Sequence, residues 1–313
     1  MTQRPFRFGV QGGPFTDPVA LRAHARDVEA LGYDELFTAD HIGAFEPDAT
    51  LNRVDPFLPL VVAAEATTSL RLGPLVLNNE FYVPALLART ALSFDQLSQG
   101  RLVLGMGSGY AVEEHDAIGH PIRPPGARVS RFEDALSIVR PLLDTGSVHA
   151  DGDHESAHLD EVGLRPKQAH IPLLIGGFGP RMVRLAGRFA DIFQFTGLGE
   201  DPATGALDAS GFALDQVVER AAWLADAAGD RDIERSLLVQ HTAVGGDVPT
   251  VDELAARFGL DAETTTHTPF SLSGSLEQVV DKLERLRAEL GVSHVVIRDH
   301  EGFAPVVAAL SGR

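Results

Sequence analysis

The chain has 313 residues, of which 44% are hydrophobic, and it contains no cysteine. This length allows one large core or two smaller domains, and the missing cysteines exclude disulfides, thiolate nucleophiles and cysteine-based metal sites. The net charge of −18 disfavours nucleic acid and anionic membranes as partners. The excess of acidic residues is explained by solubility and does not indicate a specific function. The N-terminus lacks the apolar run of a signal peptide and no uncharged stretch reaches membrane-spanning length, so we expect a cytoplasmic protein.

Strand-like and helix-like segments alternate from residue 6 almost to the C-terminus. Apolar runs predict strands over 6–11, 35–39, 70–77, 102–106, 173–175, a segment after Asp191, 236–244 and 292–298. Helical periodicity predicts helices over 18–31, 56–67, 84–97, 129–143, a segment from Pro180, 212–228, 276–290 and 303–310. Asp17 is a suitable N-cap for the first helix, and Gly32 is a suitable stop.

About eight strand–helix pairs favour a (β/α)8 TIM barrel. The alternative is a doubly wound open sheet, which would have fewer strands and a cofactor-binding turn after its first strand. The first turn here, residues 11–15, lacks the dinucleotide-binding spacing. Two polar segments, about 145–170 and 245–273, interrupt the alternation, and we expect them to be insertions at the C-terminal face of one domain spanning 1–313.

The glycine-rich turn Gly176-Gly177-Phe178-Gly179 follows an apolar strand and precedes a helix that begins at Pro180. Glycines let the backbone come close to a ligand, and the helix start offers free N–H groups and the positive end of a dipole. The turn therefore predicts a phosphate-binding site. A tight turn without a ligand is the alternative.

Asp40 and His41 follow the second strand, at the end of the barrel where active sites are built. Histidine can transfer a proton near neutral pH, so the pair is the first catalytic candidate. The alternative is an N-cap aspartate beside a loop histidine. His300, next to Asp299 after the last strand, lies at the same expected end and is a further candidate for contact with substrate or cofactor.

Three other patterns are weaker. The third strand is expected to be core, although its end could lie along a flat ring system. Glycines 105, 107 and 109 do not match a dinucleotide fingerprint because the third glycine comes one residue early. The histidines and carboxylates of 149–158 lack metal-ligand spacing, so a solvated hairpin is expected and no metal site is predicted.

Four segments together resemble the bacterial luciferase-like superfamily of flavin and deazaflavin oxidoreductases, and the resemblance covers nearly the whole chain. The matching segments are 32–41 (GYDELFTADH), 70–77 (LRLGPLVL), 94–109 (FDQLSQGRLVLGMGSG) and 164–177, from LRP to IGG. Members of this superfamily are (β/α)8 barrels with insertions, so the resemblance implies the same fold.

The resemblance also implies a cofactor. Asp40-His41 looks like the aspartate–histidine pair of the branch that uses the deazaflavin coenzyme F420. Ser108 stands where flavin monooxygenases often place an arginine that holds the FMN phosphate. Both features favour F420, which transfers hydride and does not activate oxygen. The implied cofactor-binding residues are Asp40, Leu75, Val76, Gly107, Ser108, Gly109, Gly176, Gly177, Phe178 and Gly179.

By the same resemblance, Leu75 and Val76 lie at a strand bulge behind the ring, often with a cis peptide, and the Gly176–Gly179 turn holds the phosphate. His41 is expected to transfer a proton or polarise a substrate oxygen, while Asp40 orients His41 or binds the cofactor. Tyr110 replaces a glutamate that donates a proton in some related dehydrogenases. The residues expected near the substrate are Glu80, Tyr110, Glu114 and His300.

The sequence therefore predicts an F420-dependent oxidoreductase that transfers a hydride to or from a small organic substrate. The nearest alternative is an FMN-dependent monooxygenase that uses reduced flavin and O2. A non-catalytic flavin-binding barrel would keep the phosphate site but lose the Asp-His pair, and a metal-dependent hydrolase would need strand-end ligands absent after the first strand. A homodimer is possible, and the substrate is not named by any motif.

Overall fold

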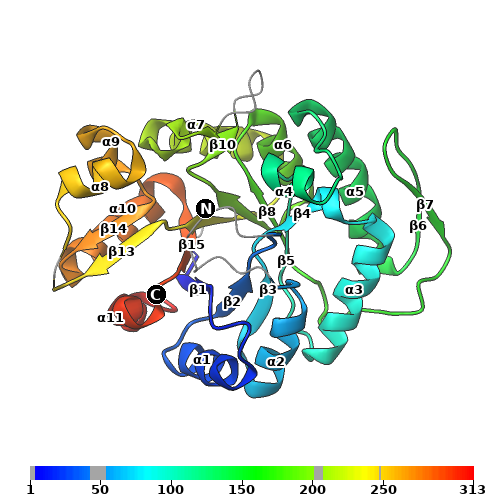
Figure 1. Ribbon diagram of the computed structural model, residues 1–313, viewed down its shortest axis with the longest axis horizontal. Helices are drawn as coiled ribbons and strands as arrows, with labels where there is room; N and C mark the ends of the chain where they lie inside the picture. The colour runs from blue at the N-terminus through cyan, green and yellow to red at the C-terminus, as the bar shows by residue number, and fades with distance from the viewer. Residues whose placement is uncertain (1–3, 43–53, 201–206, 247) are drawn as a thin grey trace. The chain divides into compact units, whose positions relative to one another are not determined.

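The computed structural model describes residues 4–42, 54–200, 207–246 and 248–313 (Figure 1). Its strands are β1 (Arg7–Gln11), β2 (Glu35–Thr38), β3 (Arg71–Pro74), β4 (Leu77–Asn78), β5 (Leu104–Gly107), β6 (Val148–Asp151), β7 (Ser156–Leu159), β8 (Leu173–Gly177), β9 (Ile192–Phe195), β10 (Gly199–Glu200), β11 (Leu207–Asp208), β12 (Glu234–Leu238), β13 (His241–Val244), β14 (Ser271–Gly274) and β15 (Val292–Ile297). Its helices are α1 (Pro18–Ala30), α2 (Leu58–Ala66), α3 (Pro84–Leu97), α4 (Val112–Ala117), α5 (Pro125–Thr145), α6 (Pro180–Phe189), α7 (Leu214–Ala228), α8 (Val251–Phe258), α9 (Ala262–His267), α10 (Leu276–Leu290) and α11 (His300–Leu310), with short 3₁₀ turns at Asn79–Phe81 and Ser210–Phe212.

The main sheet has the strand order β3-β2-β1-β15-β12-β9-β8-β5-β4. Neighbours such as β1 and β15, β12 and β9, and β5 and β8 run parallel. The first and last strands of this order, β3 and β4, are two halves of the single strand predicted over 70–77, so nine strands fill eight positions. This is the strand order of a (β/α)8 barrel, and it confirms the predicted fold class.

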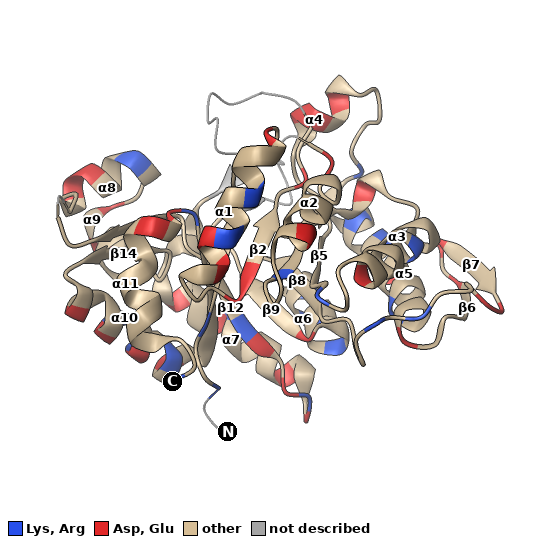
Figure 2. Cartoon of the chain, turned by 90° about the horizontal axis from the view of Figure 1, so that it is seen from below, with Lys and Arg blue, Asp and Glu red and all other residues tan. Residues whose placement is uncertain are grey.

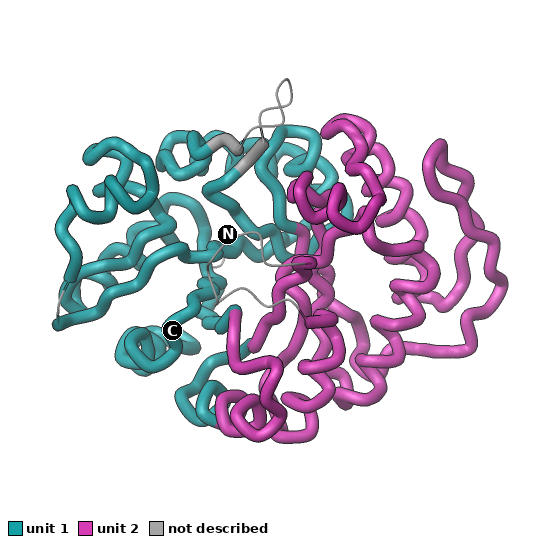
Figure 3. The backbone as a smooth tube through the Cα atoms, viewed as in Figure 1, with its two compact units in different colours: residues 1–11, 27–35, 176–313 teal, residues 12–26, 36–175 magenta. Residues whose placement is uncertain are grey.

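The chain divides into two compact units, shown in Figure 3: residues 1–11, 27–35 and 176–313 form unit 1, and residues 12–26 and 36–175 form unit 2. In unit 1, α6 packs against α7, and the core includes Phe8, Phe193 and Val295. In unit 2, α3 packs against α5, and Phe37 and Leu104 are completely buried. Acidic residues occur on helices of both units (Figure 2).

Local sequence signals set most helix ends. The Asp17 carboxylate accepts hydrogen bonds from the backbone N–H groups of Val19 and Ala20, as an N-cap does. Helix α10 begins with a capping box formed by Ser275 and Gln278, and it ends at Gly291, whose φ of 70° favours glycine. Among the described residues, none of the helices has both the length and the apolar character needed to cross a bilayer.

Two predicted strands are interrupted. The strand predicted over 70–77 breaks between β3 and β4 at the Leu75–Val76 peptide, which is cis, as the family resemblance implied. The strand predicted over 236–244 is wrong as a single element. Its first half, β12, pairs with β15, and after Val239 the backbone changes partner, because β13 pairs with β14.

The two polar insertions are folded. Strands β6 and β7 form an antiparallel hairpin that packs against α5, and its histidines are exposed, as predicted for 149–158. The second segment contains β13, α8, α9 and β14, with β13 and β14 paired in parallel.

Candidate active site

The candidate site begins at the end of β2, in unit 2, where Asp40 is held by neighbouring loops. Its Oδ2 accepts a hydrogen bond of 2.9 Å from the backbone N–H of Asn78, which ends β4. The Tyr82 hydroxyl also donates to this carboxylate. Burial raises the pKa of Asp40 to about 6 in spite of both hydrogen bonds. Burial, together with the nearby charge of Asp40, raises the pKa of Tyr82, so this phenol stays protonated.

This carboxyl group makes stability depend on pH in a defined direction. Because the pKa of Asp40 is higher in the folded chain than in the unfolded chain, its favourable contribution is complete at low pH and is lost as pH rises through about 6. Relative to Asp40→Asn, we expect the unliganded protein to lose about 2 kcal/mol of unfolding free energy between pH 4 and pH 7. Urea unfolding of both proteins at the two pH values measures this, and a constant difference would contradict it.

His41, the next residue, pairs with a carboxylate far along the chain. Its Nδ1 lies 2.7 Å from Oε1 of Glu114 on α4, and its Nε2 lies 3.5 Å from the Tyr110 hydroxyl. The His41 and Tyr110 rings meet edge to face, with centroids 6.0 Å apart. The Glu114 carboxylate therefore accepts the Nδ1 hydrogen and leaves Nε2 as the atom that can exchange a proton.

Glu114 is unusual because only part of its carboxylate is used. The side chain is 9% exposed, and its Oε2 is buried without a hydrogen-bond partner among the residues that the structure describes. A buried carboxylate oxygen without a donor is costly. The atom is suited to accept a hydrogen bond from a bound molecule.

The loop after β5 requires glycine where Tyr110 is presented. Gly109 has a φ of 82°, and a Cβ atom there would come within 2.1 Å of the Asn78 amide oxygen. The Asn78 amide nitrogen donates to Nε2 of His115, whose Nδ1 donates to the His120 carbonyl. Burial lowers the pKa of His115, which keeps this ring neutral in its bridging role. These hydrogen bonds connect the end of β4 to α4, the helix that follows β5.

Other residues implied to line the ring lie on the same strands. Leu75 is buried and its N–H donates to the Thr38 carbonyl, while Val76 is partly exposed. Gly107 ends β5, and Ser108 is half-buried with no hydrogen bond to any described residue. These positions are compatible with the predicted ring contacts, which remain a proposal.

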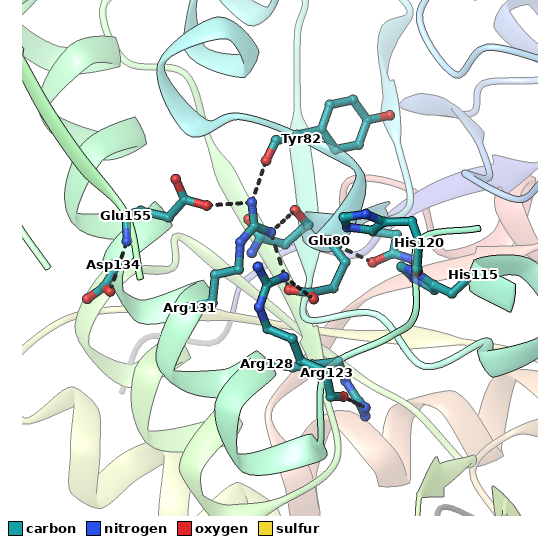
Figure 4. A network of polar contacts seen from close by, with 11 residues as sticks. Glu80, Tyr82, His115, His120, Arg123, Arg128, Arg131, Asp134 and Glu155 are labelled. Carbon is teal, nitrogen blue, oxygen red and sulfur yellow. Dashed lines mark hydrogen bonds and ion pairs between the residues drawn. The ribbon is translucent and has the colours of Figure 1, made fainter. Parts of the chain in front are cut away.

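Glu80 lies in a buried network of ion pairs. Its side chain is completely buried, with Oε2 2.7 Å from Arg123 and Oε1 3.2 Å from Arg131 (Figure 4). Arg131 also pairs with Glu155 at 2.5 Å and donates to the Tyr82 carbonyl. Because both carboxylate oxygens are paired and inaccessible, we assign Glu80 to holding the loop after β4 instead of the predicted contact with substrate.

The glycine turn belongs to unit 1. Strand β8 ends at Gly177, and α6 begins at Pro180 with Gly179 as N-cap and no side chain capping its first N–H groups. A Cβ atom built at Gly179 meets no atom within 4 Å, so its side is open. In the same unit, His300 begins α11, and its carbonyl accepts a hydrogen bond from the Tyr33 hydroxyl.

Comparison with known protein families identifies the family of this chain. The model of the luciferase-like monooxygenase family matches residues 4–222. The chain belongs to this family. The assignment confirms the resemblance found in the sequence.

Proteins similar to this chain carry out different reactions. An F420-dependent glucose-6-phosphate dehydrogenase from Intrasporangium calvum is 33% identical over 57% of this chain and 54% of that protein, so the match spans about half of its length. A 5,10-methylenetetrahydromethanopterin reductase from Archaeoglobus fulgidus is 26% identical over 93% of this chain and 92% of that protein. The fold matches a coenzyme F420 dependent tetrahydromethanopterin reductase from Methanopyrus kandleri with a TM-score of 0.75, at 19% identity, over 98% of both chains.

The structure adds residues that the sequence did not single out. Asn78 and Tyr82 hold Asp40, and neither has a local signal beyond its place after a strand. Glu114 was expected near the substrate, and the structure pairs its carboxylate with Nδ1 of His41. Among the described residues, no group of three or more histidine or acidic side chains could hold a metal ion.

Proposed function

We propose that this member of the luciferase-like family is an F420-dependent oxidoreductase that transfers a hydride between the deazaflavin coenzyme and a small organic substrate. The observation that carries the proposal is the His41–Glu114 pair beside the buried Asp40, in a chain whose relatives include a dehydrogenase named for its dependence on F420. When bound, F420 supplies a ring that gives or accepts a hydride.

The residues that would hold the cofactor form two groups, one in each unit. In unit 2 they are Asp40, Leu75, Val76, Gly107, Ser108 and Gly109. In unit 1 they are Gly176, Gly177, Phe178 and Gly179. The uncapped start of α6 and the open side of Gly179 fit an anionic group. Oε2 of Glu114, which has no partner among the described residues, fits a hydrogen-bond donor on a ligand.

His41 would carry the proton chemistry. Glu114 fixes the ring and its tautomer through Nδ1, so Nε2 can donate or accept a proton at a substrate oxygen. The Tyr110 hydroxyl, beside Nε2, would contact the same substrate atom or pass the proton on. Tyr110 is 51% exposed, so it is accessible to a substrate. His300 is kept as a proposed substrate contact.

The wider expectations belong to this proposal as well. We infer a single domain over residues 1–313, a cytoplasmic location, a possible homodimer and no nucleic-acid partner. The net charge of −18 supports the last of these, because a strongly negative chain repels a polyanion.

Separate titrations of the purified protein with F420 and with FMN test the proposal. We expect the absorbance and fluorescence of F420 to change on binding, with saturation in the micromolar range or below, and FMN to bind at least tenfold more weakly. Bovine serum albumin, another acidic protein, is the control for non-specific binding. Tight binding of FMN without binding of F420 would overturn the proposal in favour of the monooxygenase.

A further inference from the structure

Arg220 on α7 is a buried cation that pairs with no carboxylate among the side chains that the structure describes. The side chain is 2% exposed, and its three donor groups reach the carbonyls of Gln216 at 3.0 Å, Thr196 at 2.6 Å and Gly211 at 2.7 Å. Arg220 forms no ion pair with any side chain that the structure describes. Charged residues are rarely buried without a counter-ion, because carbonyls satisfy the hydrogen bonds but leave the net charge uncompensated.

This cation lies against the glycine turn. The Arg220 guanidinium carbon is 4.9 Å from the centre of the Phe178 ring, the one large side chain of the turn. The Phe178 ring in turn rests on Gly211, where an added Cβ would come within 2.2 Å of a ring carbon. Phe178 therefore packs between the Arg220 guanidinium and Gly211, which places the cation directly beside the glycine turn.

Two independent features then favour an anion at the same turn. The start of α6 has no capping side chain, so the positive end of its dipole is available. The second feature is the positive charge of Arg220, whose guanidinium lies over the Phe178 ring. Burial lowers the pKa of Arg220 to about 10, so the group remains protonated at neutral pH. A buried charge in a poorly solvated position acts on a nearby anion with little screening.

This inference rests on the proposed function. We propose that Arg220 is a positioning residue that supplies the buried counter-charge for the phosphate group of the deazaflavin cofactor. Arg220 acts through the Phe178 turn and does not touch the phosphate. A residue that only held loops together would affect the fold and all ligands alike. A counter-charge instead affects only ligands that carry the phosphate.

The test compares two ligands. One is F420, and the other is the deazaflavin with its ribityl chain but without phosphate. We expect Arg220→Gln to raise the dissociation constant of F420 at least tenfold and that of the phosphate-free ligand less than threefold. Arg220→Lys loses most of the same hydrogen bonds but keeps the charge, so we expect it to lower Tm similarly and to raise the dissociation constant of F420 less than threefold.

A matched control lies at the other end of α6. Arg231 donates to the carbonyls of Gly187 and Ala190, both at 2.7 Å, so Arg231→Gln removes comparable contacts far from the glycine turn. We expect Arg231→Gln to lower Tm and to leave the ratio of the two dissociation constants unchanged.

A second variant keeps the test decisive if Arg220→Gln does not fold. Gln216 is half-exposed and lies one helical turn before Arg220, so Gln216→Glu introduces a carboxylate partner while Arg220 stays. We expect it to weaken F420 binding several-fold and to spare the phosphate-free ligand. Equal weakening of both ligands, or no change in either, would overturn the counter-charge. A wild-type protein that binds neither ligand would instead overturn the proposed function.

Discussion

His41→Ala is expected to lower kcat by about 10²–10⁴-fold while the dissociation constant of F420 changes less than threefold. The reason is that Nε2 of His41 is the proposed proton-exchanging atom of the site, whereas Nδ1 of His41 is hydrogen-bonded to Glu114. Steady-state rates, followed by F420 absorbance with a substrate found in a screen that begins with glucose 6-phosphate, measure the change. Fluorescence titration measures cofactor binding separately.

Two further variants define the role of His41. Glu114→Gln keeps a side chain of the same shape but removes the carboxylate that orients the ring, so kcat should fall by about tenfold and its pH dependence should change. His158→Ala removes an exposed histidine that pairs with Asp151 on the β6–β7 hairpin, and it should leave kcat unchanged. Wild-type turnover by His41→Ala would remove the proposed proton transfer.

Glu80→Gln is expected to destabilise the protein by about 3 kcal/mol, which places it among the most damaging single substitutions. The substitution preserves volume but removes one of the two carboxylate charges, with Glu155, that compensate the almost completely buried Arg131, and it breaks the pair with Arg123. Urea unfolding monitored by circular dichroism measures the difference.

Glu161→Gln is the matched control for this prediction. Glu161 pairs with Arg165 on the surface, where solvent surrounds both side chains, so the loss of its charge should change stability little. If Glu80→Gln unfolds at the same urea concentration as the wild type, the buried network does not stabilise the loop after β4, and the assignment of Glu80 to a structural role fails.

Local chemistry explains what the sequence predicted well. The helix starts marked by Asp17 and Pro180 lie where capping and φ preferences place them. The alternation of apolar strands with amphipathic helices was sufficient for the barrel class, because each element must bury one face against its neighbours. The break between β12 and β13 was missed. Gln240 and His241 interrupt the apolar residues where the strand partner changes, but two polar residues do not distinguish a break from the polar face of one continuous strand.

Tertiary structure alone decided the partners of the charged residues. His41 and Glu114 are 73 positions apart, and Glu80 meets Arg131 51 positions later. In the sequence, the buried position of Arg220 is indicated only by a charged residue among the apolar positions of α7. This pattern does not identify Phe178 as the neighbour of Arg220. Short-range preferences act over a few residues and set the elements, whereas a buried charge takes its partner from wherever strand register brings two loops together.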